Sequence, residues 1–368
     1  MKYARWSPLH DVPRFPADRF AELADRLARL LDTSSDVLLI QAEAVLALEA
    51  VALGLARPGL VALNIETSFY GDWFGRWLQR GGATVYRLAA EPGRPISLDA
   101  VAKAISMLAS LDIVSVVHGE GANGVVNPLS DIARLARERN ALVVVDAVAS
   151  VGAHHLSVDA EGLDVAVIGP QKALGGPAGI SAVSVSRAAW QRFEAPGGLT
   201  TSSLSVLDLK REWLDRGRGA IPGTPVDLEF WALDAALDRV EAEGLETLID
   251  RHHRAARATR RGLRALGVTP WIEDDSAASA LLTAAPVPAE IDAAQLVQLA
   301  RRLDDGVSAG GPGVADRLVR LNHTGPRAQF SSVLATLLAY GTALKALGLP
   351  VSPGAAAEAV AAIYSSAT

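Results

Sequence analysis

Val143-Val144-Val145-Asp146-Ala147-Val148-Ala149-Ser150 is an apolar, β-branched run that contains a single carboxylate. This composition predicts a buried parallel strand with Asp146 at its carboxyl end. In open α/β sheets, ligands bind outside the carboxyl ends of the strands. Asp146 is therefore the first candidate for a functional side chain.

The next informative stretch is Ile168-Gly169-Pro170-Gln171-Lys172-Ala173-Leu174-Gly175-Gly176-Pro177-Ala178-Gly179. Its one lysine has small neighbours and little to pair with, so its amine can be partly neutral and nucleophilic, as Schiff-base chemistry requires. An aspartate and a lysine at neighbouring strand ends suit a pyridoxal ring, because the carboxylate keeps the pyridine nitrogen protonated and the amine forms the imine. Lys172 and Asp146 are the predicted catalytic residues.

Strand-like and helical segments alternate around these two stretches. Short apolar runs are predicted as strands at 37–40, 60–65, 83–87, 113–117, 165–168 and 180–185. This alternation favours an α/β fold with a mostly parallel, doubly wound sheet and a smaller C-terminal α+β domain. We expect an N-terminal arm at 1–16, a large cofactor-binding domain at 17–245, a small domain at 246–350 and a tail at 351–368, with one long helical stretch at 226–266 linking the domains.

The composition of the chain excludes several classes of function. The 368 residues carry a net charge of −6, which gives no basic surface for nucleic acid, and there is no cysteine for a disulfide or a thiolate site. No His, Asp and Glu spacing predicts a metal site, and no apolar run has membrane-spanning length. We expect a cytoplasmic enzyme with no metal and no membrane partner.

Several motifs together resemble one enzyme family. Asp146-Ala147-Val148-x-Ser150, followed by Gln171-Lys172-Ala173-Leu174-x-x-Pro177-x-Gly179, resembles the class V branch of the fold-type I aminotransferases, which depend on pyridoxal 5′-phosphate (PLP). The segments 118–129, 69–77 and 320–325 are similar to the family's ring loop, ring-stacking segment and carboxylate-binding arginine segment. The resemblance spans about residues 36 to 325.

The resemblance implies roles for particular residues. Tyr70 would stack on one face of the ring and Val148 would pack on the other, while Arg320 would anchor the carboxylate of the substrate. Tyr70 and Glu43 would also contact substrate, and the remaining cofactor-binding candidates are Ala44, Asn123, Gln171 and Thr224. The substrates would be an amino donor and a 2-oxo acid. Thr224 would reach the site of a second copy, so we expect a homodimer.

The phosphate site departs from the family pattern. The family places a Gly, Ser or Thr-rich turn after its first strand to hold the phosphate, whereas this chain has Gln41-Ala42-Glu43-Ala44. Pro170 and Ile221 stand where the family often has further polar groups. The combination resembles an unusual branch that takes unphosphorylated pyridoxamine as a substrate, in which Glu43 would accept a hydrogen bond from the 5′-hydroxymethyl group. The bound compound is therefore PLP as a cofactor, or pyridoxamine and pyridoxal as substrates.

Three alternatives stay open at this point. Glu43 could turn to solvent or pair with Arg76, with backbone amides alone holding a phosphate. The chain could be a PLP enzyme with a rebuilt phosphate site that transaminates, decarboxylates or β-eliminates an unusual amino acid. It could also be a binding module without activity, although the intact Lys172, Asp146 and Arg320 argue against this. Gly311 stands where the pyridoxamine branch has a second arginine, so the oxo acid could differ or the amine substrate could be larger. We expect Glu120 to hold an arginine or backbone, and His252 and His253 to be solvated.

Overall fold

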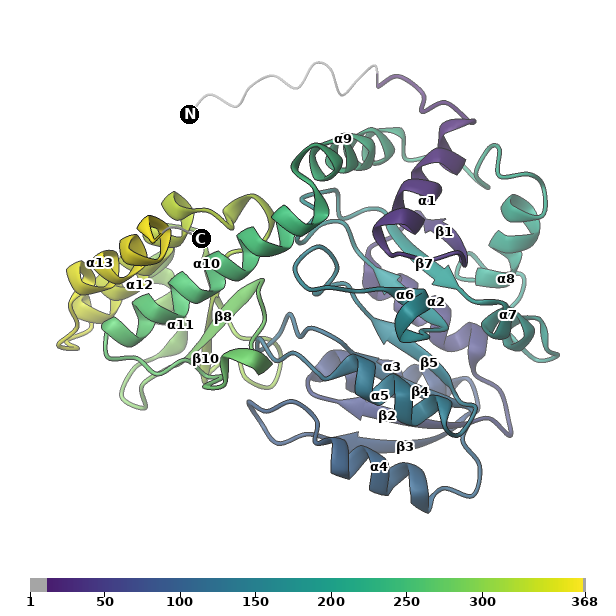
Figure 1. The fold of residues 1–368 in the computed structure, drawn as a ribbon, viewed down its shortest axis with the longest axis horizontal. Helices are drawn as coiled ribbons and strands as arrows, with labels where there is room; N and C mark the ends of the chain where they lie inside the picture. The colour runs from purple at the N-terminus through teal and green to yellow at the C-terminus, as the bar shows by residue number, and fades with distance from the viewer. Residues whose placement is uncertain (1–11, 367–368) are drawn as a thin grey trace.

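A seven-stranded sheet forms the centre of the larger part of the molecule (Figure 1). The computed structural model describes residues 12–366, so the predicted N-terminal arm lies outside the described residues as far as Asp11. The strand order is β1-β7-β6-β5-β4-β2-β3. The strands are β1 (Asp36–Ile40), β2 (Val61–Glu66), β3 (Thr84–Ala89), β4 (Ile113–Val117), β5 (Leu142–Asp146), β6 (Val165–Ile168) and β7 (Ser181–Val185).

The sheet is mostly parallel, which confirms the fold predicted from the sequence. β3, β2, β4, β5 and β6 run parallel to one another, and β7 runs antiparallel to both β6 and β1. Parallel neighbours need a crossover, usually a helix, whereas antiparallel ones do not. The link from β6 to β7 carries Lys172 and no helix, so the chain returns antiparallel there.

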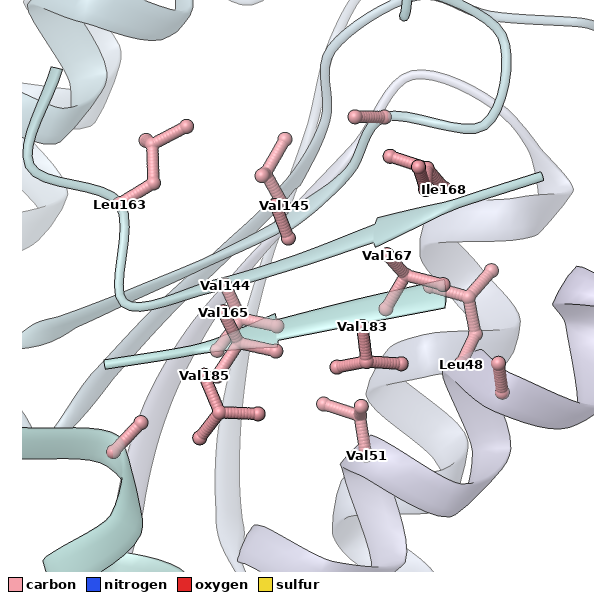
Figure 2. Packing of buried hydrophobic residues seen from close by; sticks show 14 of the residues in the cluster. Leu48, Val51, Val144, Val145, Leu163, Val165, Val167, Ile168, Val183 and Val185 are labelled. Carbon is pink, nitrogen blue, oxygen red and sulfur yellow. The ribbon is translucent and has the colours of Figure 1, made fainter. Parts of the chain in front are cut away.

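Helices cover the sheet because each has an apolar face that must leave water. They are α1 (Arg19–Leu30), α2 (Ala44–Leu55), α3 (Phe69–Arg80), α4 (Leu98–Met107), α5 (Leu129–Arg137), α6 (Val158–Glu161), α7 (Arg187–Glu194) and α8 (Val206–Leu209), which continues into a π-helical turn at Lys210–Leu214. Figure 2 shows α2 packing Leu48 and Val51 towards valines of the central strands. These β-branched residues are fully or almost fully buried, and the β5 strand read from the sequence is buried along its whole length.

A second, smaller body carries the C-terminal residues. Its antiparallel sheet has the order β8-β10-β9 and is covered by helices that build their own apolar core. Its strands and helices are β8 (Leu282–Pro286), β9 (Val307–Ala309), β10 (Leu318–Asn322), α10 (Leu245–Ala265), α11 (Ala293–Arg301), α12 (Phe330–Ala346) and α13 (Pro353–Ser365), with 3₁₀ turns at Asp275–Ala277 and Gly325–Arg327. The β9 strand was not expected from the sequence.

The predicted stretch at 226–266 is divided into two helices. α9 (Asp227–Glu243) ends at Gly244 and α10 begins directly after it. Gly244 has φ +84°, a left-handed value that favours glycine and ends a helix. The break lets α9 stay on the larger body while α10 crosses to the smaller one (Figure 1).

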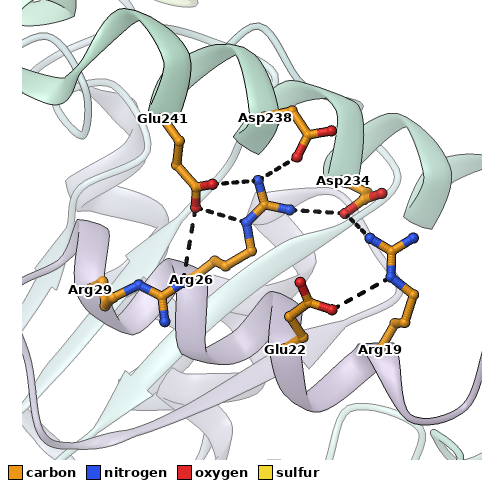
Figure 3. Close-up of polar contacts among 7 residues, drawn as sticks. All are labelled: Arg19, Glu22, Arg26, Arg29, Asp234, Asp238 and Glu241. Atoms are coloured by element: carbon orange, nitrogen blue, oxygen red, sulfur yellow. Dashed lines mark hydrogen bonds and ion pairs between the residues drawn. The ribbon is translucent and has the colours of Figure 1, made fainter.

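Ion pairs fix α9 to α1 (Figure 3). The Arg26 guanidinium is 2.9 Å from Asp234, 2.7 Å from Asp238 and 2.8 Å from Glu241, and Arg19 lies 2.7 Å from the same Oδ1 oxygen of Asp234. The Arg26 side chain is only 5% exposed, so this cluster replaces most of its hydration with carboxylate contacts. Among residues 12–366, no helix is long and apolar enough to cross a membrane.

Candidate active site

The two residues first singled out in the sequence lie together. Asp146 ends β5, Lys172 lies in the loop that follows the neighbouring strand β6, and Tyr70 is the second residue of α3. All three line one cavity of about 50 Å³, at the carboxyl edge of the parallel strands. Glu43, Ala44 and Val148 line it too. Six of the predicted site residues therefore share a single cavity.

Lys172 has no charged partner in contact. Within the described residues its Nζ makes no side-chain hydrogen bond or ion pair, and it lies 5.9 Å from the centre of the Tyr70 ring. Burial lowers the pKa of Lys172, against the opposing effects of Asp146, Glu120 and Glu43. A Cβ at Gly121 would lie 2.9 Å from Nζ, so the glycine leaves the amine its space. A desolvated, unpaired amine is the form that attacks a carbonyl carbon.

Asp146 keeps one oxygen available to the cavity. Its Oδ1 accepts a hydrogen bond of 2.9 Å from the backbone N–H of Val148, and no donor among residues 12–366 occupies Oδ2. Burial raises the pKa of Asp146, while Lys172 and the Val148 N–H lower it. A buried carboxylate with one free oxygen suits a protonated ring nitrogen, which would supply the missing donor.

Arg320 enters from the smaller body on β10. Its Nε donates to the carbonyl of Ala309 at 2.8 Å and its Nη1 to the carbonyl of Gly121 at 2.7 Å, which fixes the guanidinium. Burial lowers the pKa of Arg320. Within the described chain, Nη2 makes no hydrogen bond and can serve a carboxylate. Arg320 does not line the Lys172 cavity itself.

Glu43 closes the start of α2 as its N-cap. Its Oε2 accepts from the backbone N–H of Val45 at 2.8 Å, and its Oε1 accepts from Nε2 of Gln171 at 3.1 Å. Arg76 instead lies 3.0 Å from Asp72, so the pairing of Glu43 with Arg76 is absent from the described structure. The Glu43 carboxylate thus occupies an N–H group that would otherwise face an anion.

Three predicted cofactor residues lie elsewhere. Gln171 reaches the cavity only through Glu43. The Asn123 side chain is taken up by the carbonyl of Thr67 at 2.8 Å and the N–H of Val125 at 3.1 Å, because it stabilises a turn. Thr224 is exposed and lines a different cavity of about 640 Å³, whose lining residues do not include Lys172.

Two expectations about nearby polar residues are wrong. His252 is fully buried, where it accepts from the N–H of Gly325 at 2.9 Å and contacts the carbonyl of Leu248. It is buried because α10 packs that side against the turn after β10. Glu120 holds neither an arginine nor only backbone, since its two oxygens accept from the hydroxyls of Thr67 and Ser68. The sequence does contain a pattern that points to these hydroxyls: Thr67-Ser68 lies between a strand and a helix, which is typical of a helix N-cap.

Comparisons with known proteins agree with this geometry. The family model described as aminotransferase class V matches residues 17–331. This chain belongs to the class V aminotransferase family. A pyridoxamine–pyruvate transaminase of Mesorhizobium japonicum is 33% identical over 346 residues, covering 94% of this chain and 88% of the relative.

Solved structures of this class V family have the same fold. The crystal structure of pyridoxamine–pyruvate aminotransferase from Mesorhizobium loti has a TM-score of 0.89 at 33% identity, covering 94% of this chain and 88% of that one. Ureidoglycine–glyoxylate aminotransferase from Bacillus subtilis has a TM-score of 0.87 at 24% identity, covering 97% and 94%. The chain is thus a fold-type I aminotransferase, which moves an amino group to or from a 2-oxo acid with a B6 compound. Decarboxylation and β-elimination are not favoured by these relatives.

The cavity fits the ring that class V chemistry uses. The unpaired amine of Lys172 and the free oxygen of Asp146 are the two groups that such a ring needs from the protein. When bound, a pyridoxal-type ring withdraws electrons from the substrate carbon that loses its proton. Such a ring would need a carboxylate at its nitrogen and an amine near the reacting carbon, and Asp146 and Lys172 offer these two groups in one cavity.

Proposed function

We propose that this aminotransferase exchanges an amino group between an unphosphorylated B6 compound, pyridoxamine or pyridoxal, and a small 2-oxo acid. The observation that carries the proposal is the Glu43 carboxylate at the start of α2, beside the Lys172 cavity. In this proposal Lys172 and Asp146 are catalytic, Tyr70 and Val148 contact the ring faces, and Arg320 binds the oxo acid. The relatives named for pyridoxamine and pyruvate support it.

Electrostatics at the start of α2 favour a neutral group over a phosphate. A dianion about 4–6 Å from a carboxylate, at an effective dielectric of about 20, meets a penalty of several kcal/mol. A hydroxymethyl group meets no such penalty and gains a hydrogen bond to an anion, worth about 1.5–3 kcal/mol. The N–H of Val45, which a phosphate would need, is already taken by Glu43. The turn 41–44 offers no hydroxyl and no glycine in compensation.

The oxo acid meets one fixed arginine. A Cβ at Gly311 would lie 2.8 Å from both Ala122 Cβ and the Phe69 ring, so the second arginine of the pyridoxamine branch has no space here. In this proposal Arg320 supplies the carboxylate contact without an arginine at position 311, and its Nη2, which makes no hydrogen bond within the described residues, is the group that makes it. A 2-oxo acid with a single carboxylate, pyruvate being the first to test, matches this arrangement.

The test of the proposal is a titration of the protein, freed of B6 compounds, with pyridoxal and with PLP. We expect pyridoxal to bind more tightly. Glu43→Gly should shift the preference towards PLP, and Glu43→Gln should shift it part of the way, because it removes the charge and keeps an acceptor. Glu49→Gln, on the same helix, should leave the preference unchanged. Tighter binding of PLP to the wild-type protein would overturn the proposal.

We also propose that two copies form a homodimer in the cytoplasm. Gly223 and Thr224 are exposed and line a cavity whose lining residues do not include Lys172, which is consistent with a role for Thr224 in the site of a second copy. Light scattering at micromolar concentration should give twice the mass of one chain, and a monomer would contradict the proposal.

A further inference from the structure

Glu120 is a fully buried carboxylate that the chemistry described so far does not use. It lies in the loop after β4 and is 0% exposed. Its Oε1 accepts a hydrogen bond from Thr67 Oγ1 at 2.5 Å, and its Oε2 accepts from Ser68 Oγ. Burial raises the pKa of this carboxyl group, and the hydrogen bonds from the two hydroxyls oppose that effect.

Ser68 connects this carboxylate to the helix that carries Tyr70. Ser68 is the N-cap of α3, and its Oγ accepts a hydrogen bond of 3.2 Å from the backbone N–H of Tyr70. An N-cap serine can turn its own hydrogen in several directions, but here that hydrogen is directed to Glu120. The carboxylate, the hydroxyl and the Tyr70 N–H therefore form one continuous chain of hydrogen bonds.

The same loop holds the start of α3 at two more points. Asn123 donates to the carbonyl of Thr67 at 2.8 Å, and Asn127 donates to Thr67 Oγ1 at 2.9 Å. The segment Thr67-Ser68 is thus fixed on the loop by three side chains. Two residues after Ser68, the Tyr70 ring lines the cavity with Lys172.

We propose that Glu120 is a positioning residue for the Tyr70 ring, acting through the hydroxyl of Ser68, so that Tyr70 meets the B6 ring at a fixed distance from Lys172. The inference rests on the proposed contact of Tyr70 with that ring. It assigns Glu120 no contact with substrate. Its carboxylate near the N-terminus of α3 also lies where the helix dipole favours negative charge.

The chain contains a matched pair at the opposite edge of the sheet. Ser186 is the N-cap of α7, accepts from the N–H of Ala189 at 3.0 Å and donates to Asp164 Oδ1 at 2.8 Å. Asp164 precedes β6, far from the carboxyl ends that carry the cavity. This pair also joins an N-cap serine to a carboxylate but has no link to Tyr70, so it controls for the loss of a partly buried N-cap contact.

The experiment compares Glu120→Gln, Ser68→Ala and the double variant with Asp164→Asn and Ser186→Ala. Pyridoxal affinity is measured by absorbance titration. The kcat and KM values are measured with pyridoxamine and pyruvate as substrates. Stability is measured as the melting temperature. We expect Glu120→Gln and Ser68→Ala each to weaken pyridoxal binding roughly tenfold, which is the scale of a lost N-cap contact. The KM for pyruvate, which depends on Arg320, should stay unchanged.

The double variant and the control pair test whether Glu120 acts on Tyr70 through the hydroxyl of Ser68. Because both groups belong to one chain of contacts, the double variant should bind pyridoxal no more weakly than the worse single variant. Asp164→Asn and Ser186→Ala should lower the melting temperature without changing pyridoxal affinity. Additive losses in the double variant would overturn the route through Ser68, and a Glu120→Gln protein that loses only stability would overturn the positioning role.

Tyr70→Ala separates this inference from the proposal on which it rests. If Tyr70→Ala leaves pyridoxal affinity unchanged, the contact of Tyr70 with the ring is wrong. If Tyr70→Ala weakens pyridoxal binding and both Glu120→Gln and Ser68→Ala do not, only the positioning role of Glu120 is wrong. Should Glu120→Gln fail to fold, Ser68→Ala alone still removes the same link and gives the same readout.

Discussion

Arg26 and Lys172 are both cations beside three carboxylates, and the two surroundings have opposite effects. Arg26 touches Asp234, Asp238 and Glu241 within 2.9 Å. The charges of Asp146, Glu120 and Glu43 act to raise the pKa of Lys172. Within the described residues, however, Lys172 makes no hydrogen bond or ion pair with any of them. The first cluster joins two helices and the second lines a cavity.

The pKa values of Arg26 and Lys172 are shifted in opposite directions by these surroundings. Burial by itself lowers the pKa of Arg26, but Glu241 and Asp238 outweigh it and the pKa is raised. Burial also lowers the pKa of Lys172, and there the carboxylates do not outweigh it. A cation in direct contact with carboxylates is stabilised and chemically inert. A buried amine without contacts costs free energy in the folded state and is available for reaction.

Lys172→Ala should have the largest effect on activity. The variant loses the one amine among the described residues that line the cavity, so turnover should fall by roughly 10²–10⁴-fold or more. The melting temperature should not fall, because an unpaired buried amine is removed. Lys103→Ala, on the exposed side of α4, is the control and should keep full turnover. A strongly destabilised Lys172→Ala protein would show that the two clusters are alike.

Arg320→Ala should weaken oxo-acid binding. Loss of a partly buried, charge-assisted contact costs about 2–5 kcal/mol, which would appear as a raised KM for pyruvate. Pyridoxal affinity should change little, since Arg320 does not line the Lys172 cavity. Arg317→Ala, a nearby exposed arginine, provides the comparison. Equal losses of both affinities would mean that Arg320 chiefly maintains the structure.

Arg26→Met should unfold the protein more easily and leave its chemistry intact. Breaking a buried ion pair costs about 3 kcal/mol at the lower end of its range, which we expect here because Arg19 still contacts Asp234. The measurement is the free energy of unfolding in urea, with the exposed Arg29→Met as control. A reduced kcat in the folded variant would contradict the separation of the two clusters.

Glu120→Gln should change how stability depends on pH. Burial raises the pKa of Glu120 from 4.5 to about 7, so the folded protein takes up a proton that the unfolded chain releases. The contribution of Glu120 to stability is therefore lost as pH rises from 4.5 through about 7. Over that window the melting temperature of the wild type should fall relative to the variant, by a few degrees at most. A constant difference would show that Glu120 does not titrate there.

The neighbourhood of the lysine shows what the sequence could and could not reveal. The β-branched strand before Asp146 and the glycine-rich loop around Lys172 are local patterns, so both elements could be predicted. The N-cap role of Glu43 has a local cause as well, since it precedes the first turn of α2. Asn123 was predicted to bind the cofactor because of the family motif. In the folded loop its side-chain amide instead donates to the carbonyl of Thr67 and accepts from the N–H of Val125, which the sequence alone does not reveal.

The sequence by itself determined the α/β class, the parallel sheet and the pairing of an aspartate with a lysine at strand ends, because apolar periodicity and glycine placement act over a few residues. Only the tertiary structure decided that His252 is buried, that Glu120 accepts from Thr67 and Ser68, and that Gly311 packs against Phe69. These contacts join segments far apart in the chain. Burial and hydrogen-bond partners depend on the whole packed arrangement, which no local pattern encodes.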